Sequence, residues 1–195
     1  AIGFLQEGLR WWDHWLKDMD NGVMEEPAVQ IYEQEHEQPV TNRTQIAGAW
    51  RAADDLPDRE PLRFHLHGDA MTETPPEASG NATVQYLPAA CRNGGLWDAG
   101  VPFTLAGEQS EDSARALNFT TQPLTDDLAI LGSPTFRFHI SADTEIMPVA
   151  VRLIDVAPEG TGALVTKGIL NATRRDGTDC PRPLTPGENT EVAFH

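Results

Sequence analysis

Residues 10–29 read RWWDHWLKDMDNGVMEEPAV, and the spacing of apolar residues changes within this stretch. Over the first twenty residues, large apolar side chains recur at spacings of three and four, which predicts one amphipathic helix. The apolar stripe consists of Leu5, Leu9, Trp12, Leu16 and Met19, widened by Phe4, Trp11 and Trp15. Asn21-Gly22 is typical of a left-handed helix stop, and Pro27 marks the exit into alternating segments.

Beyond Pro27, short runs alternate apolar and polar residues, as half-buried β-strands do. The predicted strands are residues 28–33, 62–67, 83–87, 115–121, 135–141, 149–156, 164–174 and 191–194. Turns rich in Gly and Pro separate them, and we predict no second helix. Because each strand must bury one apolar side, we expect a mainly β fold, a jelly-roll (galactose-binding-like) β-sandwich preceded by the helix.

Two segments are too long for hairpin turns, residues 39–61 and residues 88–113. We expect them to cross between sheets or to cover a sheet edge, since exposed strand edges invite aggregation.

The charge of the chain excludes several classes of partner. Thirty Asp and Glu against 14 Lys and Arg give a formal net charge of -16, which repels nucleic-acid phosphates and anionic lipids. No apolar run approaches the ~20 residues needed to cross a bilayer. We therefore expect a soluble protein that binds neither nucleic acid nor membrane, with the cytoplasm favoured over secretion.

The sequence offers no catalytic or cofactor-binding motif. The nucleophile elbow Gly-x-Ser-x-Gly, the phosphate-binding loop, the dinucleotide-binding Gly-x-Gly-x-x-Gly and the zinc motif His-Glu-x-x-His are all missing from it. We accordingly assign no catalytic, cofactor-binding or metal-binding residue.

Three groups of polar residues offer alternatives to that assignment. His65 and His67 share one strand face and offer two ligands to a metal, but solvent-facing polar residues are the favoured interpretation. Asp112 with Asp126-Asp127 could line a calcium site, although acidic loops follow from the composition alone. We interpret His14, which lies among tryptophans, as a packed structural residue.

Two pairs of residues leave alternatives open. Trp50 and Trp97 lie in long loops, where they either pack under the loop or stack on sugar rings. Cys91 and Cys180 are either free thiols or one disulfide bridge.

The helix stripe needs a partner. Burying five or more large side chains at ~1.5–3 kcal/mol each outweighs what an isolated helix of this length gains from its own propensity. We expect this face to be covered either by the rest of the chain or by a second copy that packs on the helix through Trp11, Trp12 and Trp15.

Several motifs resemble one known family. Residues 10–22, followed by Glu26-Pro27-Ala28-Val29, resemble the junction of the X-Pro dipeptidyl-peptidase and cocaine-esterase family, which reads RWFDHWLKG, then NG, then EPPV. Further motifs follow in the family's order. They are Ala49-Trp50, the segment 62–68, Leu131-Gly132-Ser133-Pro134, the segment 151–156 with Pro158-Glu159-Gly160, and Gly168-Ile169-Leu170 leading to Arg174-Arg175.

The resemblance implies a larger serine hydrolase, built from an α/β-hydrolase domain with a Ser, Asp, His triad, a helical cap and a jelly-roll domain. Residues 1–22 would be the last helix of the hydrolase domain and residues 23–195 the jelly-roll domain, with the triad upstream of Ala1 and further strands after His195. The sequence departs from the family at Thr144–Pro148, where family members have a Pro-Asp-Thr-Asp-Phe-like stretch.

The sequence is consistent with two functions. The first is an accessory domain that packs on the catalytic α/β-hydrolase domain of its parent chain, helps to wall the active-site cleft and is inert alone. The second is a carbohydrate-binding module, a common role of jelly rolls.

Overall fold

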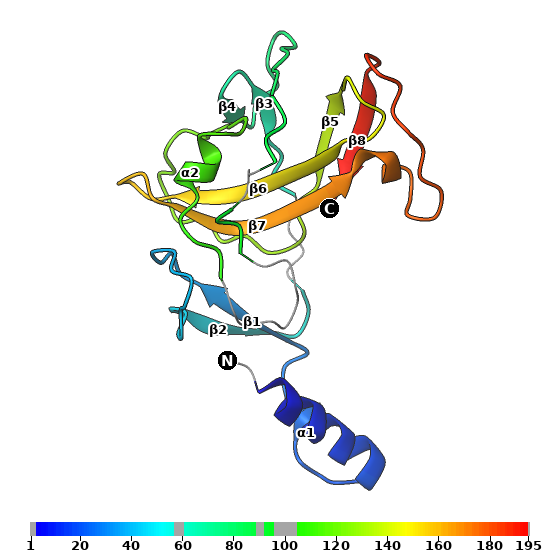
Figure 1. Ribbon diagram of the computed structural model, residues 1–195. Coiled ribbons are helices and arrows are strands. Elements are labelled where there is room, and N and C mark those ends of the chain that lie inside the picture. The colour runs from blue at the N-terminus through cyan, green and yellow to red at the C-terminus, as the bar shows by residue number, and fades with distance from the viewer. Residues whose placement is uncertain (1–2, 57–60, 89–91, 96–104, 195) are drawn as a thin grey trace. The chain divides into compact units, whose positions relative to one another are not determined.

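A computed structural model describes residues 3–56, 61–88, 92–95 and 105–194 of the chain (Figure 1). The chain divides into two compact units. The first contains Ala1–Glu37 and Arg43–Arg63, and the second contains Gln38–Asn42 and Phe64–His195.

The first unit begins with α1, Phe4–Lys17, which confirms the helix predicted from the apolar stripe. The predicted stop is wrong in position, because the left-handed residue that ends α1 is Asp18, at φ 52°. Asn21 instead ties the following segment back to the helix, since its side-chain amide donates to the Arg10 carbonyl at 2.7 Å. The 3-10 helix η1, Val23–Glu25, leads on to the first strand.

Strands β1, Val29–Gln34, and β2, Gly48–Ala53, form an antiparallel pair in which Tyr32 lies opposite Trp50. β1 was predicted, whereas β2 lies in the segment 39–61 that we expected to cross between sheets. Its sequence, GAWRAA, is rich in alanine and lacks the alternation that marks a strand. Gly48 suits this pairing, since a Cβ atom there would lie 2.1 Å from the Glu33 carbonyl oxygen.

The described residues of the second unit form three antiparallel strand pairs (Figure 1). β3, His65–His67, pairs with β4, Ala70–Thr72, across a turn at Gly68. β5, Phe136–Ile140, pairs with β8, Thr190–Phe194. β6, Pro148–Val156, and β7, Gly162–Asn171, form the longest ribbon, with a register shift between Leu153 and Ile154.

Most of the predicted strands in this unit are confirmed, and two are wrong. Residues 83–87 form no strand, and residues 115–121 form only an isolated bridge from Thr120 to Ala70. The second stretch follows a short helix that we did not predict, α2, Ser110–Ser113. Asn118 holds it in a turn, since its side-chain amide donates to the Ser113 and Ala116 carbonyls. Similarly, β7 ends before predicted, where the Asn171 side chain caps the 3-10 helix η2, Ala172–Arg174.

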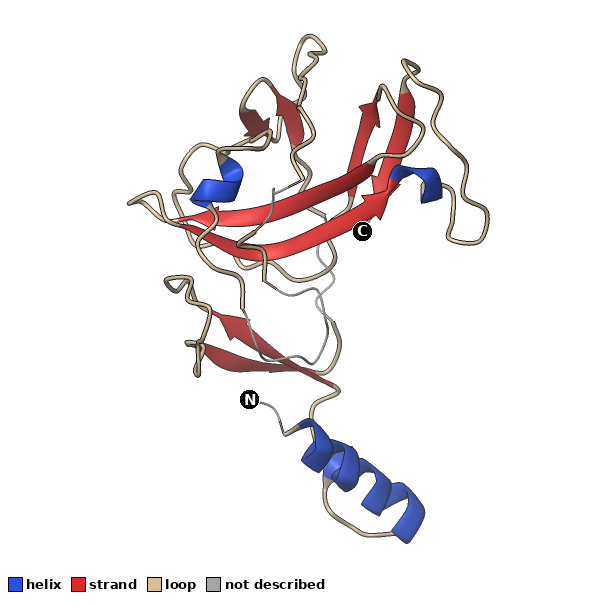
Figure 2. Cartoon of the chain, viewed as in Figure 1, coloured by secondary structure: helices blue, strands red, loops and turns tan. Residues whose placement is uncertain are grey.

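Strands and loops dominate the fold, which confirms a mainly β protein (Figure 2). In the described part of the chain, each sheet contains two strands. The buried apolar residues there are few: Ala157, Ala172, Leu184 and Val192. Three polar residues are buried as well, namely Gln109, Asp112 and Thr173.

Candidate functional site

The apolar face of α1 is the first candidate surface. None of the fourteen described residues of this helix is buried, and Trp12 and Trp15 are 55% and 52% exposed. The rings of Trp11 and Trp15 lie 5.8 Å apart, and His14 packs edge-on against Trp15. His14 Nδ1 lies 3.1 Å from the Met19 carbonyl oxygen, so this ring contacts the helix end, as a structural histidine would.

The polar face of α1 binds the segment that follows the helix. The Arg10 guanidinium donates to Glu26 and, at 2.7 Å, to Glu7. These contacts, first the hydrogen bond to Glu26, raise the pKa of Arg10 above its ordinary value. The polar side of the helix is therefore satisfied within the first unit, whereas large apolar side chains remain exposed.

Trp50 is the second exposed aromatic residue of interest. It is 54% exposed on β2, and the ring of Tyr32 on β1 meets it at 5.3 Å in an edge-on arrangement. The Tyr32 hydroxyl donates to the Ile46 carbonyl at 2.7 Å, which fixes that ring. Trp97, the other loop tryptophan considered above, lies outside the described residues.

A polar cluster in the second unit, which we call the Asp112 cluster, comprises the buried Gln109 and Asp112 and the half-buried Glu108 and Arg152. Asp112 is 1% exposed, and its two carboxylate oxygens accept the backbone N–H groups of Arg92 and Asn93 at 3.0 and 2.8 Å. The nearest guanidinium nitrogen of Arg152 lies 3.9 Å from the same carboxylate. This carboxylate is thus engaged by two amides and one cation.

Gln109 connects the cluster to the surrounding backbone and is fully buried. Its side-chain nitrogen donates to the Asn93 and Gly107 carbonyls at 2.8 and 2.7 Å, and its side-chain oxygen accepts from Arg152 at 2.8 Å. Both ends of this amide are therefore satisfied, as a buried polar group requires.

Glu108 joins the cluster to the β6–β7 turn. It accepts hydrogen bonds from the hydroxyl and backbone N–H of Ser110 and from the Gly162 backbone N–H. These bonds, first that from the Ser110 hydroxyl, lower the pKa of Glu108 below its ordinary value, against the opposing effect of burial.

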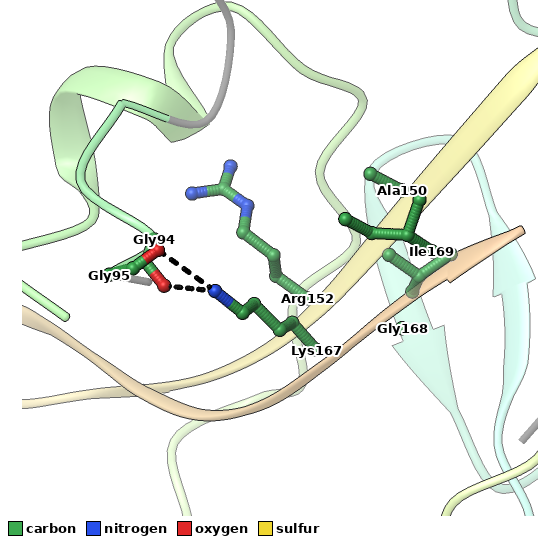
Figure 3. A pocket seen from close by; sticks show the side chains of 8 residues that line it. Gly94, Gly95, Ala150, Arg152, Lys167, Gly168 and Ile169 are labelled. Atoms are coloured by element: carbon green, nitrogen blue, oxygen red, sulfur yellow. Dashed lines mark hydrogen bonds between the residues drawn. The ribbon is translucent and has the colours of Figure 1, made fainter. Parts of the chain in front are cut away.

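A cavity of about 140 Å³ lies beside the cluster, between Gly94 and Gly95 on one side and Ala150 and Ile169 on the ribbon. Figure 3 shows the Lys167 ammonium group pointing at the Gly94 and Gly95 carbonyls, with Arg152 extending alongside. Lys167 lies opposite Arg152 in the register of β6 and β7. The cavity is small, and both of its cationic side chains hold neighbouring groups of the protein.

The metal-site alternatives gain no support. Asp112 is buried and engaged as described, whereas Asp126 and Asp127 are exposed. Among the described residues, which include His65 and His67, no group of three or more metal-binding side chains comes together. Cys180 is exposed with a free thiol, and Cys91 lies outside the described residues. In the described part of the chain, no helix is both long enough and apolar enough to cross a bilayer.

Sequence reasoning missed Glu108, Gln109 and Arg152 as parts of one site. Arg152 gave the only signal, a charge between Val151 and Leu153 in a predicted strand. Nothing local indicates that Gln109 lies beside it, 43 residues earlier in the chain.

Curated relatives share low but extended similarity with the chain. Two proteins named as serine esterases, from Mycobacterium bovis and Mycobacterium tuberculosis, are each 25% identical to it over 212 residues. The alignments cover 96% of this chain but only 32% of each relative, so the chain spans about a third of their length. No solved structure matches significantly.

The family comparison is more specific. Residues 21–195 match the X-Pro dipeptidyl-peptidase C-terminal non-catalytic domain, and the match begins where α1 has ended. This agrees with the resemblance carried by the junction motif. The chain belongs to the family of X-Pro dipeptidyl-peptidase C-terminal non-catalytic domains.

Proposed function

We propose that this chain is the accessory domain of a serine hydrolase of the X-Pro dipeptidyl-peptidase or acyl-esterase type, and that it is inert alone. It packs on the catalytic α/β-hydrolase domain and helps to wall the active-site cleft. The observation that carries the proposal is the exposed apolar surface, above all on α1. Family membership and the serine esterase names of the relatives support the kind of partner.

Large apolar side chains of the described residues are exposed in both units. Leu5 and Leu16 of α1 are 78% and 73% exposed, and Leu124 and Ile146 of the second unit are 60% and 63% exposed. Exposed apolar side chains in such numbers are typical of an interaction surface. They favour burial against a further domain.

Exposed apolar side chains on the β6–β7 ribbon also support the division into domains that we propose. Residues 1–22 are the last helix of the hydrolase domain, and residues 23–195 form a jelly-roll sandwich that is completed by strands beyond His195. Val156, Val165 and Ile169 of the β6–β7 ribbon are about half exposed. Two-stranded ribbons with such side chains need a second layer to bury them.

Activity measurements on the chain test the proposal directly. We expect no turnover of activated esters or of X-Pro anilides, because the Ser, Asp, His triad lies in the catalytic domain. The parent protein, with residues upstream of Ala1, is expected to cleave at least one of these substrates and to lose that activity when its nucleophilic serine is replaced by alanine. Turnover by the chain itself that survives purification would contradict the proposal.

A second candidate function, carbohydrate binding, rests on the exposed Trp50. Its indole ring is braced by Tyr32 and presents a free surface on which a sugar ring could stack. This function predicts that polysaccharides quench tryptophan fluorescence in the wild-type chain but not in Trp50→Ala. Tryptophan fluorescence that stays constant during titration with varied polysaccharides would contradict carbohydrate binding.

A further inference from the structure

The backbone of residues 92–95 belongs to no helix or strand, yet side chains from distant elements bind it. The N–H groups of Arg92 and Asn93 donate to Asp112 of α2. The Asn93 carbonyl accepts from the Gln109 amide and from the Gly107 N–H. Lys167 of β7 donates to the Gly94 and Gly95 carbonyls. Four consecutive residues thus have backbone groups held by side chains 16 to 73 residues away.

The groups that hold this segment are themselves fixed. Asp112 and Gln109 are 1% and 0% exposed, and the Arg152 guanidinium contacts both. The Gln109 N–H also donates to the Gly162 carbonyl at 3.0 Å, which anchors the start of α2 to the ribbon. Opening the segment would strip a buried carboxylate of two hydrogen bonds, and an unsatisfied buried charge is costly.

We propose that the Asp112 cluster and Lys167 together form an internal latch that fixes residues 92–95 on the β6–β7 ribbon within this chain, before any partner docks. The long segment 88–113 is then preorganised in its described part rather than shaped by a binding partner. An asparagine at position 112 could not replace Asp112, because both side-chain oxygens of Asp112 accept N–H groups and an amide offers only one oxygen.

The latch goes beyond the accessory function and does not depend on it, since all of its contacts lie within the second unit. If the accessory function holds as well, a preorganised segment lowers the ordering cost of docking on a catalytic domain.

Amide hydrogen exchange of the whole chain, measured residue by residue, tests the latch. The reporters are the N–H groups of Arg92, Asn93 and Gly107, and the reference is the set of amides bonded between β6 and β7. We expect the wild-type reporters to be protected. Asp112→Asn should accelerate their exchange by about 10- to 100-fold, the effect of losing hydrogen bonds to a charged group, and leave the reference amides protected.

Glu111→Gln is the matched control, because it makes the same charge change one residue earlier on α2, at a carboxylate that is exposed and paired with Arg115. It should leave the reporters unchanged. Wild-type reporters that exchange at unprotected rates would overturn the latch, and so would an Asp112→Asn chain whose reporters are unaffected. If Asp112→Asn does not fold, Lys167→Met provides the test. Acceleration at residues 92–95 would support the latch, and unaltered exchange there would overturn it.

Discussion

Helix α1 and the Asp112 cluster differ in the side chains that they expose and bury. The helix presents large apolar side chains to solvent, although burying such groups is the main driving force of folding. The cluster buries charged and polar groups, although burying them is costly, and gives each a partner from the same chain. The comparison indicates that the second unit contains a self-sufficient polar core, whereas α1 leaves its apolar face uncovered by the rest of the first unit.

The largest expected effect comes from breaking the cluster at its cation. Arg152→Met leaves Asp112 buried without its guanidinium and Gln109 without a donor, and should lower the free energy of unfolding by about 3 kcal/mol. Urea unfolding followed by circular dichroism measures it.

Arg137→Met is the matched control, because Arg137 is also a strand arginine with a carboxylate near it, that of Glu191 at 3.7 Å. Both members of this ion pair are exposed, so the loss of stability should stay within about 0.5 kcal/mol. Equal losses of unfolding free energy in Arg152→Met and Arg137→Met would mean that burial of the cluster contributes nothing to stability.

Two side-chain truncations compare how much a buried and an exposed apolar residue contribute to the stability of the chain. Val192 on β8 is fully buried, and Val192→Ala should cost about 2 kcal/mol through lost contacts and the cavity left behind. Trp12→Ala removes a far larger side chain from α1 but should cost less than about 0.5 kcal/mol in this chain, because that side chain is more than half exposed. A loss from Trp12→Ala that exceeds the loss from Val192→Ala would show that the chain itself covers the helix.

The smallest effect concerns the pH dependence of the cluster. Because the folded-state pKa of Glu108 is lowered, its contribution to stability is fully present above its ordinary pKa of 4.5 and is lost as the pH falls through the folded value. Glu108 is only half-buried, so the contribution should be a few tenths of a kcal/mol. In Glu108→Gln, thermal unfolding between pH 3 and pH 6 should show a flatter pH dependence than in the wild type. An unchanged slope would refute this role.

Sequence reasoning succeeded where the signal is local. The apolar spacing from Leu5 to Leu16 predicts α1, and the alternation of Phe136, Phe138 and Ile140 predicts β5. It failed at β2, whose alanines hide the alternation, and at Ser110–Ser113, a single helical turn.

The Asp112 cluster could not be predicted for a different reason. Its members contact groups up to 54 residues away in the chain, and neither a period nor a motif brings Asp112, Gln109 and Arg152 together. The sequence offers Asp112 as a possible calcium ligand, but in the structure its carboxylate oxygens accept backbone N–H groups instead.

The most direct test of the account is hydroxyl-radical footprinting of Trp12 and Trp15 in this chain and in the parent protein. The chain is held at a concentration where light scattering reports a monomer, which separates an uncovered helix from one that is buried against a second copy. We predict rapid oxidation of both tryptophans in the chain and strong protection in the parent, where we propose that the catalytic domain covers α1. Protection in the monomeric chain, or equal oxidation in the two proteins, would contradict the account.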